Sequence, residues 1–508
     1  TMAVTSGKWY WEGQFSATTS GNEANRYFGV VDAEKNPASG SVNTNGWVGY
    51  LQEAGSAQII DHGSSTNITG QTAVKSDYWA VALDMDAGKI WFAKNNSWLD
   101  VGSGAGNPAT AANPAFTNLL STGSGIVTPG MSWNTDDNGG TWNFGQLGFQ
   151  YTPPSGFLAL CTANLPAPAI LDPRLHFQVQ TWAGDGGNDV EVGDTLPVDL
   201  TSTGFMQWVK NRTNTTEHDI ADDLRLSGAT HAIIYPDSSL VESASGEIDA
   251  PSSDHMKMNN ALRTNHASNN YVGWCWVGDT YGGSSNSNGT ITATVNANAT
   301  AGFSIGTYTG TGANATVGHG LSAAPDMIFI KCRDAARSWK VYHSAMSSDP
   351  QTDRLQLDTN GALYDDATAW NDTAPTSTVF SLGSHEDSNG DGDAFVAYCW
   401  TEVLGYSDFG SYIGTQDADG PVIYTGLSPR WVMIKEADAA GSNWHIYDNK
   451  RRTYNPNTVD LNADITNAES YNAAGLDLLA HGFKIRTVGT GTNESGKTYI
   501  YAAFAEFP

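Results

Sequence analysis

The segment GTNESGKT near the C-terminus has the residue types and spacing of a phosphate-binding loop. Gly491, Gly496, Lys497 and Thr498 lie in register with that pattern, in which backbone amides and the lysine hold phosphate groups. The mechanism also needs a helix after the loop, because the helix N-terminus contributes to phosphate binding. Here the aromatic segment YIYAAFAEFP follows directly, so we expect a loop between strands that binds no nucleotide.

The segment HEDSNGDGD (385 to 393) has the spacing of a calcium-binding loop. Asp387, Asn389 and Asp391 would supply oxygen ligands on alternate residues. The position that should carry a bidentate carboxylate is instead Tyr398. Asn-Gly and Asp-Gly also favour hairpin turns, which is the alternative interpretation. Calcium at these three residues is therefore a candidate cofactor, and the sequence indicates no other cofactor.

Two tryptophans in polar loops are candidate ligand-binding residues. Trp98 follows asparagines, and Trp370 precedes Asn371. Exposed indoles can stack on sugar rings while neighbouring amides bind hydroxyl groups. We therefore predict that Trp98, Trp370 and Asn371 contribute to binding.

Catalytic patterns are incomplete in this sequence. Ser304 lies in GFSIG, which fits a nucleophile elbow, but the surrounding alternation predicts a strand with no helix behind it. The eleven histidines form no HExxH pattern. Glu12, Glu402 and Glu506 lie in or beside aromatic strands and are candidate carboxylates for glycoside hydrolysis, with structural roles as the alternative. We therefore predict a protein without enzymatic activity.

The elements that would position these residues are repeated. The segment PDMIFIKCRDAARSWKVYH (325 to 343) recurs with one inserted residue as PRWVMIKEADAAGSNWHIYD (429 to 448). A more diverged copy, GFMQWVKNRTNTTEHDIADD, spans 204 to 223. A period of about one hundred residues favours consecutive small domains, each with its own core. The recurring residues are Lys331, Trp339 and Tyr342 in one copy, Lys435, Trp444 and Tyr447 in the next, and Lys210 and His218 in the diverged copy.

The repeated lysine and tryptophan have two interpretations. They could form a ligand pocket that is used more than once. A lysine that closes an apolar strand more often packs its stem and keeps its ammonium in water, while the tryptophan fills the core. We favour this structural interpretation.

Composition predicts an all-β chain. Gly, Thr, Ser, Asn, Trp and Tyr are abundant, which is typical of short strands joined by tight turns. With 53 acidic and 25 basic residues, the net charge is −28, and no basic cluster is present that could neutralise nucleic-acid phosphates. No apolar run approaches the ~20 residues that cross a bilayer. We therefore expect neither nucleic-acid binding nor membrane insertion.

The four cysteines lie in apolar strand patterns and not at zinc-site spacing. They are Cys161, Cys275, Cys332 and Cys399. Only Cys332 and Cys399 could pair within one repeat, and we predict four reduced thiols, because buried free cysteines are usual in proteins made in a reducing cytoplasm.

Residues 1 to 165 read as a series of strands. Their segments GKWYWE, YFGVVD, LDMDAGKIWFAKN and NFGQLGFQYTPPSGFLAL resemble the SPRY domain family at nearly every family motif. The resemblance implies a bent, concanavalin-like β-sandwich, a fold used mostly for protein or glycan recognition. The loops 34 to 45 and 101 to 124 are rich in Gly, Asn and Ser, so no ligand carries over from the family.

The full fold prediction is an all-β chain with a SPRY-type β-sandwich followed by three related β-sandwich-like modules. The boundaries are 1–165 for the sandwich, 175–280 for the diverged first repeat, 301–407 for the second repeat and 408–508 for the third. A proline-rich segment (166 to 177) and a polar segment (282 to 302) are the expected linkers. Because a strand pattern starts by residue 8, we expect the chain to be a fragment of a longer protein.

This combination of segments looks like that of large virion proteins of tailed phages, especially marine ones. The motifs that carry the resemblance are GHGLSAAPDMIFIK, WNDTAPTSTVFSLG and YCWTEVLGYSDFGSYIG. It implies a tail-fibre, appendage or capsid-fibre protein that is made in the host cytoplasm and acts outside the cell in the virion. The partners it implies are other virion proteins, a host-surface glycan or protein, and copies of itself, with a trimer favoured. A polysaccharide-degrading enzyme and a purely structural spacer are the alternatives.

Overall fold

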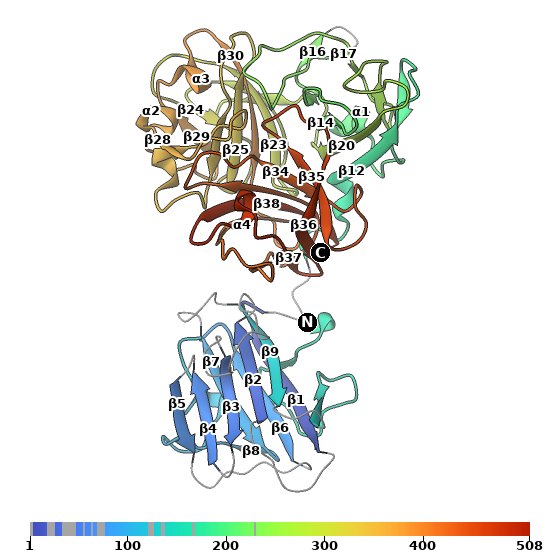
Figure 1. Cartoon of the computed structure of the whole chain (residues 1–508). Helices are drawn as coiled ribbons and strands as arrows, with labels where there is room; N and C mark the ends of the chain where they lie inside the picture. The colour runs from blue at the N-terminus through green and yellow to red at the C-terminus, as the bar shows by residue number, and fades with distance from the viewer. Residues whose placement is uncertain are drawn as a thin grey trace. The chain divides into compact units, whose positions relative to one another are not determined.

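The computed structural model places two compact units, Thr1–Ala167 and Pro168–Pro508. The residues it describes are 4–17, 26–32, 47–53, 56–61, 64–68, 77–119, 126–133, 138–164, 168–227 and 230–507. The loop 34 to 45 and residues 120 to 124 of the second predicted loop lie outside them. The prediction of an all-β chain is confirmed, because strands dominate both units (Figure 1) and each α-helix is a single turn. None of the described helices has the length and apolarity needed to span a membrane.

The first unit contains two antiparallel sheets. One has the order β10-β1-β6-β7-β8, with β11 parallel to β1, and the other has the order β5-β4-β3-β2-β9. The strands of the first sheet are β1 (Lys8–Ala17), β6 (Tyr78–Asp84), β7 (Lys89–Lys94), β8 (Ser97–Trp98), β10 (Asn138–Asn143) and β11 (Leu158–Ala159). Those of the second are β2 (Arg26–Asp32), β3 (Trp47–Glu53), β4 (Ser56–Asp61), β5 (Ser64–Ile68) and β9 (Val127–Trp133).

Side chains that alternate along β6 contribute to two separate hydrophobic clusters of this unit. Trp79, Val81 and Leu83 belong to the core cluster that also contains residues of the other sheet, such as Phe28. Ala80 and its neighbours face the opposite side and belong to a second cluster. The predicted hairpin at 86 to 88 is confirmed between β6 and β7, where the Asp84 carboxylate accepts a bond from the Ala87 amide at 3.0 Å.

The second unit repeats one sheet pattern three times. The sheet orders are β12-β20-β14-β15, β23-β30-β25-β26 and β31-β38-β33-β34, with β21 and β22 added before β23, and with β35, β36, β37 and β32 continuing after β34. The four strands of each pattern, numbered by their order in the sequence, lie side by side in the order first, fourth, second and third. In Figure 1 the three repeats occupy three sectors of this unit, in green, yellow to orange, and red.

The strands that form the repeated pattern are β12 (Phe177–Ala183), β14 (Phe205–Asn211), β15 (Asp219–Asp222), β20 (Asn270–Val277), β23 (Phe303–Thr309), β25 (Met327–Cys332), β26 (Lys340–His343), β30 (Ala394–Trp400), β31 (Ser407–Ile413), β33 (Ser428–Glu436), β34 (His445–Asp448) and β38 (Thr498–Phe507). Added strands are β13 (Val190–Val192), β16 (Leu226–Ser227), β17 (Thr230–His231), β18 (Ile248–Asp249), β19 (Met256–Met258), β21 (Ser284–Asn286), β22 (Ala293–Asn298), β24 (Ala315–Gly318), β27 (Asp353–Arg354), β28 (Tyr364–Asp365), β29 (Val379–Leu382), β32 (Val422–Tyr424), β35 (Asn457–Asn462), β36 (Ser470–Leu479) and β37 (Gly482–Ile485). The one-turn helices are α1 (Leu200–Thr203), α2 (Ala367–Trp370), α3 (Glu386–Asn389) and α4 (Thr490–Asn493).

Strand register gives the equivalent residues of the three repeats. Trp276 lies opposite Phe177 and Met206, and Trp400 lies opposite Phe303 and Met327. In the third repeat, Phe504 lies opposite Ser407 and Trp431. The same register makes Cys275, Cys399 and Ala503 equivalent. The predicted duplication, with Cys399 matching Ala503, is therefore confirmed, and the first repeat shares the same topology.

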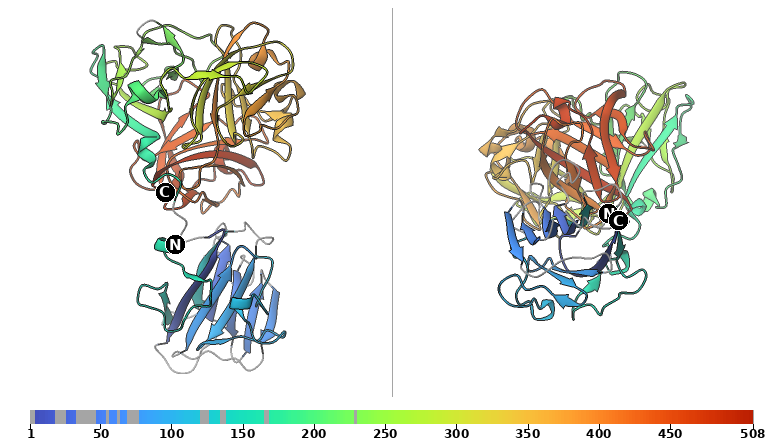
Figure 2. Two further views of the ribbon diagram at one scale, coloured as in Figure 1. Left: turned by 180° about the vertical axis from the view of Figure 1, so that it is seen from behind. Right: turned by 60° about the horizontal axis from the view of Figure 1, so that its bottom comes forward.

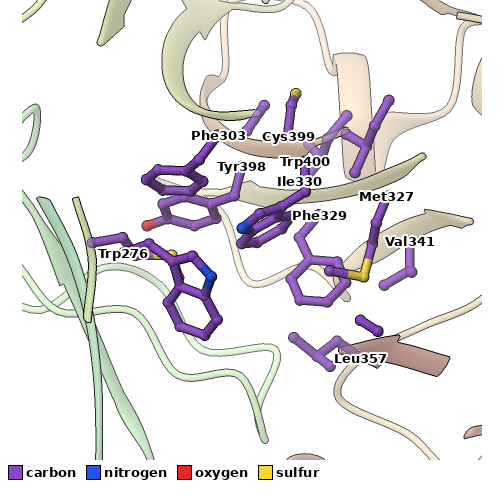
Figure 3. Packing of buried hydrophobic residues seen from close by; sticks show 14 of the residues in the cluster. Trp276, Phe303, Met327, Phe329, Ile330, Val341, Leu357, Tyr398, Cys399 and Trp400 are labelled. Carbon is purple, nitrogen blue, oxygen red and sulfur yellow. The ribbon is translucent and has the colours of Figure 1, made fainter. Parts of the chain in front are cut away.

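The inner faces of the three sheets share one hydrophobic core. A single cluster of buried residues contains Trp276, Trp400 and Phe504 together with neighbours from every repeat. Trp276 contacts Trp400 and Phe504 with ring centroids 5.9 and 5.5 Å apart. Figure 3 shows Trp276 near Tyr398 and Trp400 of the second repeat, with Phe329 beyond Trp400. The views of Figure 2 show the same grouping of the three repeats within this unit.

The expectation of successive domains with separate cores therefore needs correction. The first and third repeats do have their own buried clusters on the outer faces of their sheets, around Phe205 and Phe483 respectively. Their inner faces, however, are completed only by the other repeats. The polar segment 282 to 302 is also not a linker, because it forms β21 and β22 at the edge of the second repeat's sheet. Physically, each small sheet has two apolar faces, and burying both requires its neighbours.

Candidate functional site

The repeated lysines are buried, and two of them bond across a junction between repeats. Lys210, Lys331 and Lys435 are each 0% exposed, so the prediction that their ammonium groups stay in water is wrong. Lys331 Nζ donates to the Ser239 carbonyl of the first repeat at 2.9 Å. Lys210 Nζ donates to the Thr466 carbonyl of the third repeat at 2.8 Å. Burial lowers the pKa of all three lysines to about 8.

The repeated aromatic position also joins one repeat to another. Trp339 Nε1 donates to the Tyr235 carbonyl of the first repeat at 2.8 Å, and Trp444 Nε1 donates to the Gln356 carbonyl of the second at 2.9 Å. The backbone amides of His218, Trp339 and Trp444 bond to aspartates of their own repeats. These aspartates are Asp237, Asp358 and Asp464. Burial raises the pKa of each, and the thrice-repeated lysine, aromatic and aspartate set is structural.

Ion pairs join the first repeat to the second and to the third. Arg333 binds the Glu242 carboxylate of the first repeat through two bonds of 2.8 and 3.0 Å. Arg212 binds the Glu469 carboxylate of the third repeat through two bonds of 2.7 and 2.9 Å. At the remaining junction the equivalent residue is Ala437, whose carbonyl accepts the Leu363 amide at 2.9 Å. The Arg333 and Arg212 carbonyls likewise accept the Glu242 and Glu469 amides, at 2.8 and 3.0 Å, so this backbone bond is common to all three junctions.

Two fully buried arginine–aspartate pairs lie in the same network. Arg225 Nε binds Asp222 at 2.7 Å, and Asp222 also accepts the Tyr398 hydroxyl of the second repeat at 2.6 Å. In the third repeat Arg451 binds Asp448, which accepts Trp274 Nε1 of the first repeat at 3.1 Å. In both pairs the carboxylate connects two repeats. These charges are used for assembly and are not free for catalysis.

The predicted calcium loop and the predicted phosphate loop are the same loop of two different repeats. Asn389 and Asn493 lie in equivalent one-turn helices, α3 and α4. The Asn389 side-chain oxygen accepts the Thr311 amide at 2.8 Å, and the Asn493 oxygen accepts the Thr415 amide at 2.8 Å. Asn265 bonds to the Asp185 amide in the same manner at 3.2 Å. The loop 491 to 498 therefore connects strands as predicted.

The three candidate calcium ligands are not arranged as a ligand set. Asp387 pairs with buried Lys340 at 2.7 Å. The Asn389 amide is fully engaged with backbone groups, including the Ala313 and Gly383 carbonyls. Residues two apart on a helix point in different directions, so α3 separates Asp387 from Asn389, and Asp391 is exposed beyond it. The alternating-ligand pattern required an extended loop, and a helical turn formed instead.

The aromatic candidates differ in exposure. Trp370 is 1% exposed and its Nε1 donates to the Asp353 carbonyl at 3.0 Å, so the prediction of an exposed ring is wrong. Helix α2 turns this ring inward against Tyr342. Asn371 follows in the left-handed region with φ 54° and accepts a bond from Asn314 at 2.6 Å. Trp98 is half-buried in β8 and packs on the outer cluster of the first unit.

Each of the three candidate carboxylates has bonding partners of its own. Glu12 is 1% exposed and holds the segment after β10 by accepting the Gln150 and Tyr151 amides at 2.7 and 2.9 Å. Glu506 accepts a bond from the Asn449 amide. Glu402 is exposed, and its backbone amide donates to Asp326 at 2.8 Å. Within the second unit, Glu402 and Glu506 therefore bond to different residues.

Glu402 belongs to an acidic cluster that the sequence analysis missed. Its other members are Asp326 and Asp408, and Asp408 accepts the Tyr501 hydroxyl at 2.6 Å. Burial, followed by the charges of Glu402 and Asp326, raises the pKa of Asp408 to about 7. Burial and Asp326 also raise the pKa of Glu402.

This cluster predicts a pH dependence of stability. The folded chain keeps the Asp408 proton up to about pH 7, whereas an unfolded aspartate releases it near pH 4. Stability should therefore fall as the pH rises through that window. Asp408→Asn stays uncharged, so it should gain stability relative to the wild type at pH 8 and gain less at pH 5. Thermal unfolding midpoints at both pH values measure this, and an equal difference at the two would contradict it.

A polar hollow of about 180 Å³ lies where the first repeat joins the second. Its lining comes from the turn after β20, from β21 and β22, and from Gly320. Buried Asn296 forms its floor and accepts the Asp279 amide at 2.8 Å. The remaining lining includes Thr280, Ser284, Ser285 and Asn286. Hydroxyl, amide and carboxylate groups dominate, which suits a small polar ligand such as a sugar residue.

The thiols agree with the prediction of free cysteines. All four are unpaired, with Cys275, Cys332 and Cys399 buried. Burial raises the pKa of Cys275 and Cys399 to about 12. These thiols therefore stay protonated and unreactive at neutral pH.

One sequence signal could have shown that the two loops resembling calcium- and phosphate-binding motifs are structural. Asn265, Asn389 and Asn493 each precede by ten residues an equivalent strand position, which is Cys275, Cys399 or Ala503. Aligning all three copies on these strands would have placed the two motifs on one another. The polar hollow has no such signal, because its lining residues come from a turn and an edge that only folding brings together.

Comparisons with known proteins place the larger part of the chain. No curated protein matches it. Among solved structures, the SPRY domain of human HERC1 is 21% identical, with 28% of this chain and 77% of that chain covered and a TM-score of 0.21. The model of the family described as "Domain of unknown function (DUF7483)" matches residues 172–508. That span covers all three repeats and their closed ring, and the chain therefore belongs to this family.

Proposed function

We propose that the chain is a structural component of a tailed-phage particle, a tail fibre, appendage or capsid fibre, that binds a host-surface glycan or protein. The sequence resemblance to virion proteins supports the phage origin. One structural observation supports a scaffold role above all others. The ionic groups repeated in the second unit, such as Arg333 with Glu242, join the repeats to one another. A unit held in this way can present surface loops rigidly.

The polar hollow beside β21 is the proposed glycan site. Asp279 and Ser284 are exposed at its rim, and buried Asn296 is fixed below them by bonds to Asp223 of 3.0 and 3.1 Å. A rigid floor with exposed acceptors and donors matches the alternating hydroxyl groups of a sugar. Trp98, half-buried in the first unit, remains a secondary candidate for stacking.

The proposed partners are other virion proteins and copies of the chain itself, with a homotrimer favoured because avidity strengthens weak sites. The second unit already arranges three related repeats in a ring within one chain. A homotrimer would therefore multiply a site that occurs once per chain, since the hollow's lining residues are not repeated in sequence. The proposed location is the virion, outside the cell when the protein functions.

The test compares glycan binding by matched variants of the full chain. On a glycan array, the double variant Asp279→Ala and Ser284→Ala is expected to weaken binding at least tenfold, because it removes rim groups without disturbing the core. The control is Asp365→Ala with Ser495→Ala, two exposed residues outside the hollow, which should bind as the wild type does.

Other outcomes distinguish the alternatives. Equal binding by both double variants would reject the hollow as the site. No binding by the intact chain to glycans or host cells would favour a structural spacer. Release of reducing ends from host polysaccharide, lost in Asp408→Asn, would favour the enzyme alternative, for which the raised pKa of Asp408 beside Glu402 is the specific observation.

A further inference from the structure

A histidine and two carboxylates converge on the surface of the first repeat. Glu191 lies in β13, and His255 and Asp254 lie immediately before β19. The two strands are antiparallel neighbours, with Glu191 opposite Lys257. His255 is two residues from Lys257, so its side chain lies diagonally beside Glu191 on the same face of the sheet. One nitrogen and two carboxylate oxygens of these residues lie within 4.8 Å of one another.

The distances suit a small metal ion. His255 Nδ1 lies 3.0 Å from Asp254 Oδ1 and 3.8 Å from Glu191 Oε2. Zinc bound tetrahedrally at ~2.0–2.2 Å from each ligand atom requires ligand atoms about 3.3–3.6 Å apart. The two observed distances bracket that value. Both carboxylate side chains are about half exposed, so each has room to move its oxygen to that spacing around an ion.

The orientation of the imidazole ring supplies an independent observation. The Nε2 atom of His255 lies 3.4 Å from the Thr195 hydroxyl, which is outside the cluster. Metal-binding histidines usually use their second ring nitrogen for such a bond, which fixes the ring with its other nitrogen toward the metal. The backbone on either side is also held, because the Asp254 carbonyl accepts the Leu196 amide at 2.7 Å.

The nearest lysine does not occupy the cluster. Lys257 forms an ion pair with Asp189, which directly precedes β13. Two carboxylates and one imidazole therefore face each other, and a divalent cation would balance the two negative charges. A nitrogen ligand favours zinc, nickel or copper over calcium and magnesium, which prefer oxygen alone.

We propose that Glu191, Asp254 and His255 form a binding site for a divalent transition metal such as zinc. Three protein ligands leave one position of a tetrahedral ion open to water or to a group of a bound molecule. The site is separate from the polar hollow and does not depend on the proposed function. No counterpart is expected in the other repeats, because β13 and β19 belong to a sheet found in the first repeat only.

The experiment measures metal binding by the purified full chain after treatment with a chelator. Calorimetric titration with zinc should give a site that His255→Ala weakens more than tenfold. Cobalt titration should give the visible absorption of a tetrahedral ion in the wild type and not in His255→Ala. The control is His266→Ala, an exposed histidine of the same repeat, which should bind zinc as the wild type does.

A second variant separates loss of binding from loss of folding. Glu191→Gln keeps the size of an exposed side chain, so it should fold normally and still weaken zinc binding more than tenfold. Zinc should also raise the thermal midpoint of the wild type and leave that of Glu191→Gln unchanged. Absence of zinc binding by the wild type, or equal binding by the wild type, His255→Ala and Glu191→Gln, would overturn the proposal.

Discussion

Replacing Arg225 by methionine is expected to lower the free energy of unfolding of the second unit by about 3–5 kcal/mol. The Arg225 side chain is fully buried and donates to Asp222, to Glu242 and to the Ile220 carbonyl at 2.7, 3.0 and 3.0 Å. Removing it leaves the Asp222 carboxylate buried without its counter-charge. Urea unfolding followed by fluorescence measures the loss.

The second repeat suggests the control for this variant. At the positions equivalent to Asp222 and Arg225 it carries His343 and Met346, so the fold accepts this site without an ion pair. The double variant Asp222→Leu and Arg225→Met removes both charges and should recover most of the lost stability, because an apolar pair can replace a buried ion pair at little cost. A loss below about 1 kcal/mol in the single variant would show that the pair is not needed.

Replacing Trp400 by alanine is expected to cost about 3–5 kcal/mol and to destabilise all three repeats together. Trp400 is 1% exposed, and its ring contacts Trp276 of the first repeat at a centroid distance of 5.9 Å. The cavity would open in the core that the three repeats share. Calorimetry should therefore show one transition for the whole second unit, shifted to lower temperature.

Leu404 supplies the matched control for the core variant. It lies four residues after Trp400 and is 62% exposed, so Leu404→Ala should change stability by no more than about 0.5 kcal/mol. Separate calorimetric transitions for the three repeats would contradict the shared core. They would instead support the successive independent domains expected from the repeat length.

The shared core also explains why residues that resemble ligand-binding motifs in sequence have structural roles. A small sheet that buries both faces brings strand ends and loops of neighbouring repeats into contact. Their backbone groups then need partners, since an unpaired buried polar group costs about 1–3 kcal/mol. Lys331 and Trp339 satisfy carbonyls across a junction. Asn389 satisfies three backbone groups, two of them in the segment that follows β23. The same residue types recur along the chain because the same kind of contact between repeats recurs.

The sequence by itself determined the local elements and their repetition. Apolar alternation and the Asp86-Ala87-Gly88 turn predicted β6 and β7, which are formed by contacts close in sequence. The copies 325 to 343 and 429 to 448 predicted one topology, because equal patterns of apolar residues give equal strand pairings. The prediction of free cysteines followed in the same way from their places in apolar strands.

Tertiary structure alone decided how the repeats meet and which side chains remain at the surface. Trp370 looked exposed beside Asn371, yet a single helical turn directs it into the core. Asp387 looked free for a metal, yet Lys340 neutralises it. Glu191 comes together with Asp254 and His255 only through the pairing of β13 with β19. Local patterns specify which face of a strand is apolar, but the partner of that face is set by contacts between residues far apart in sequence.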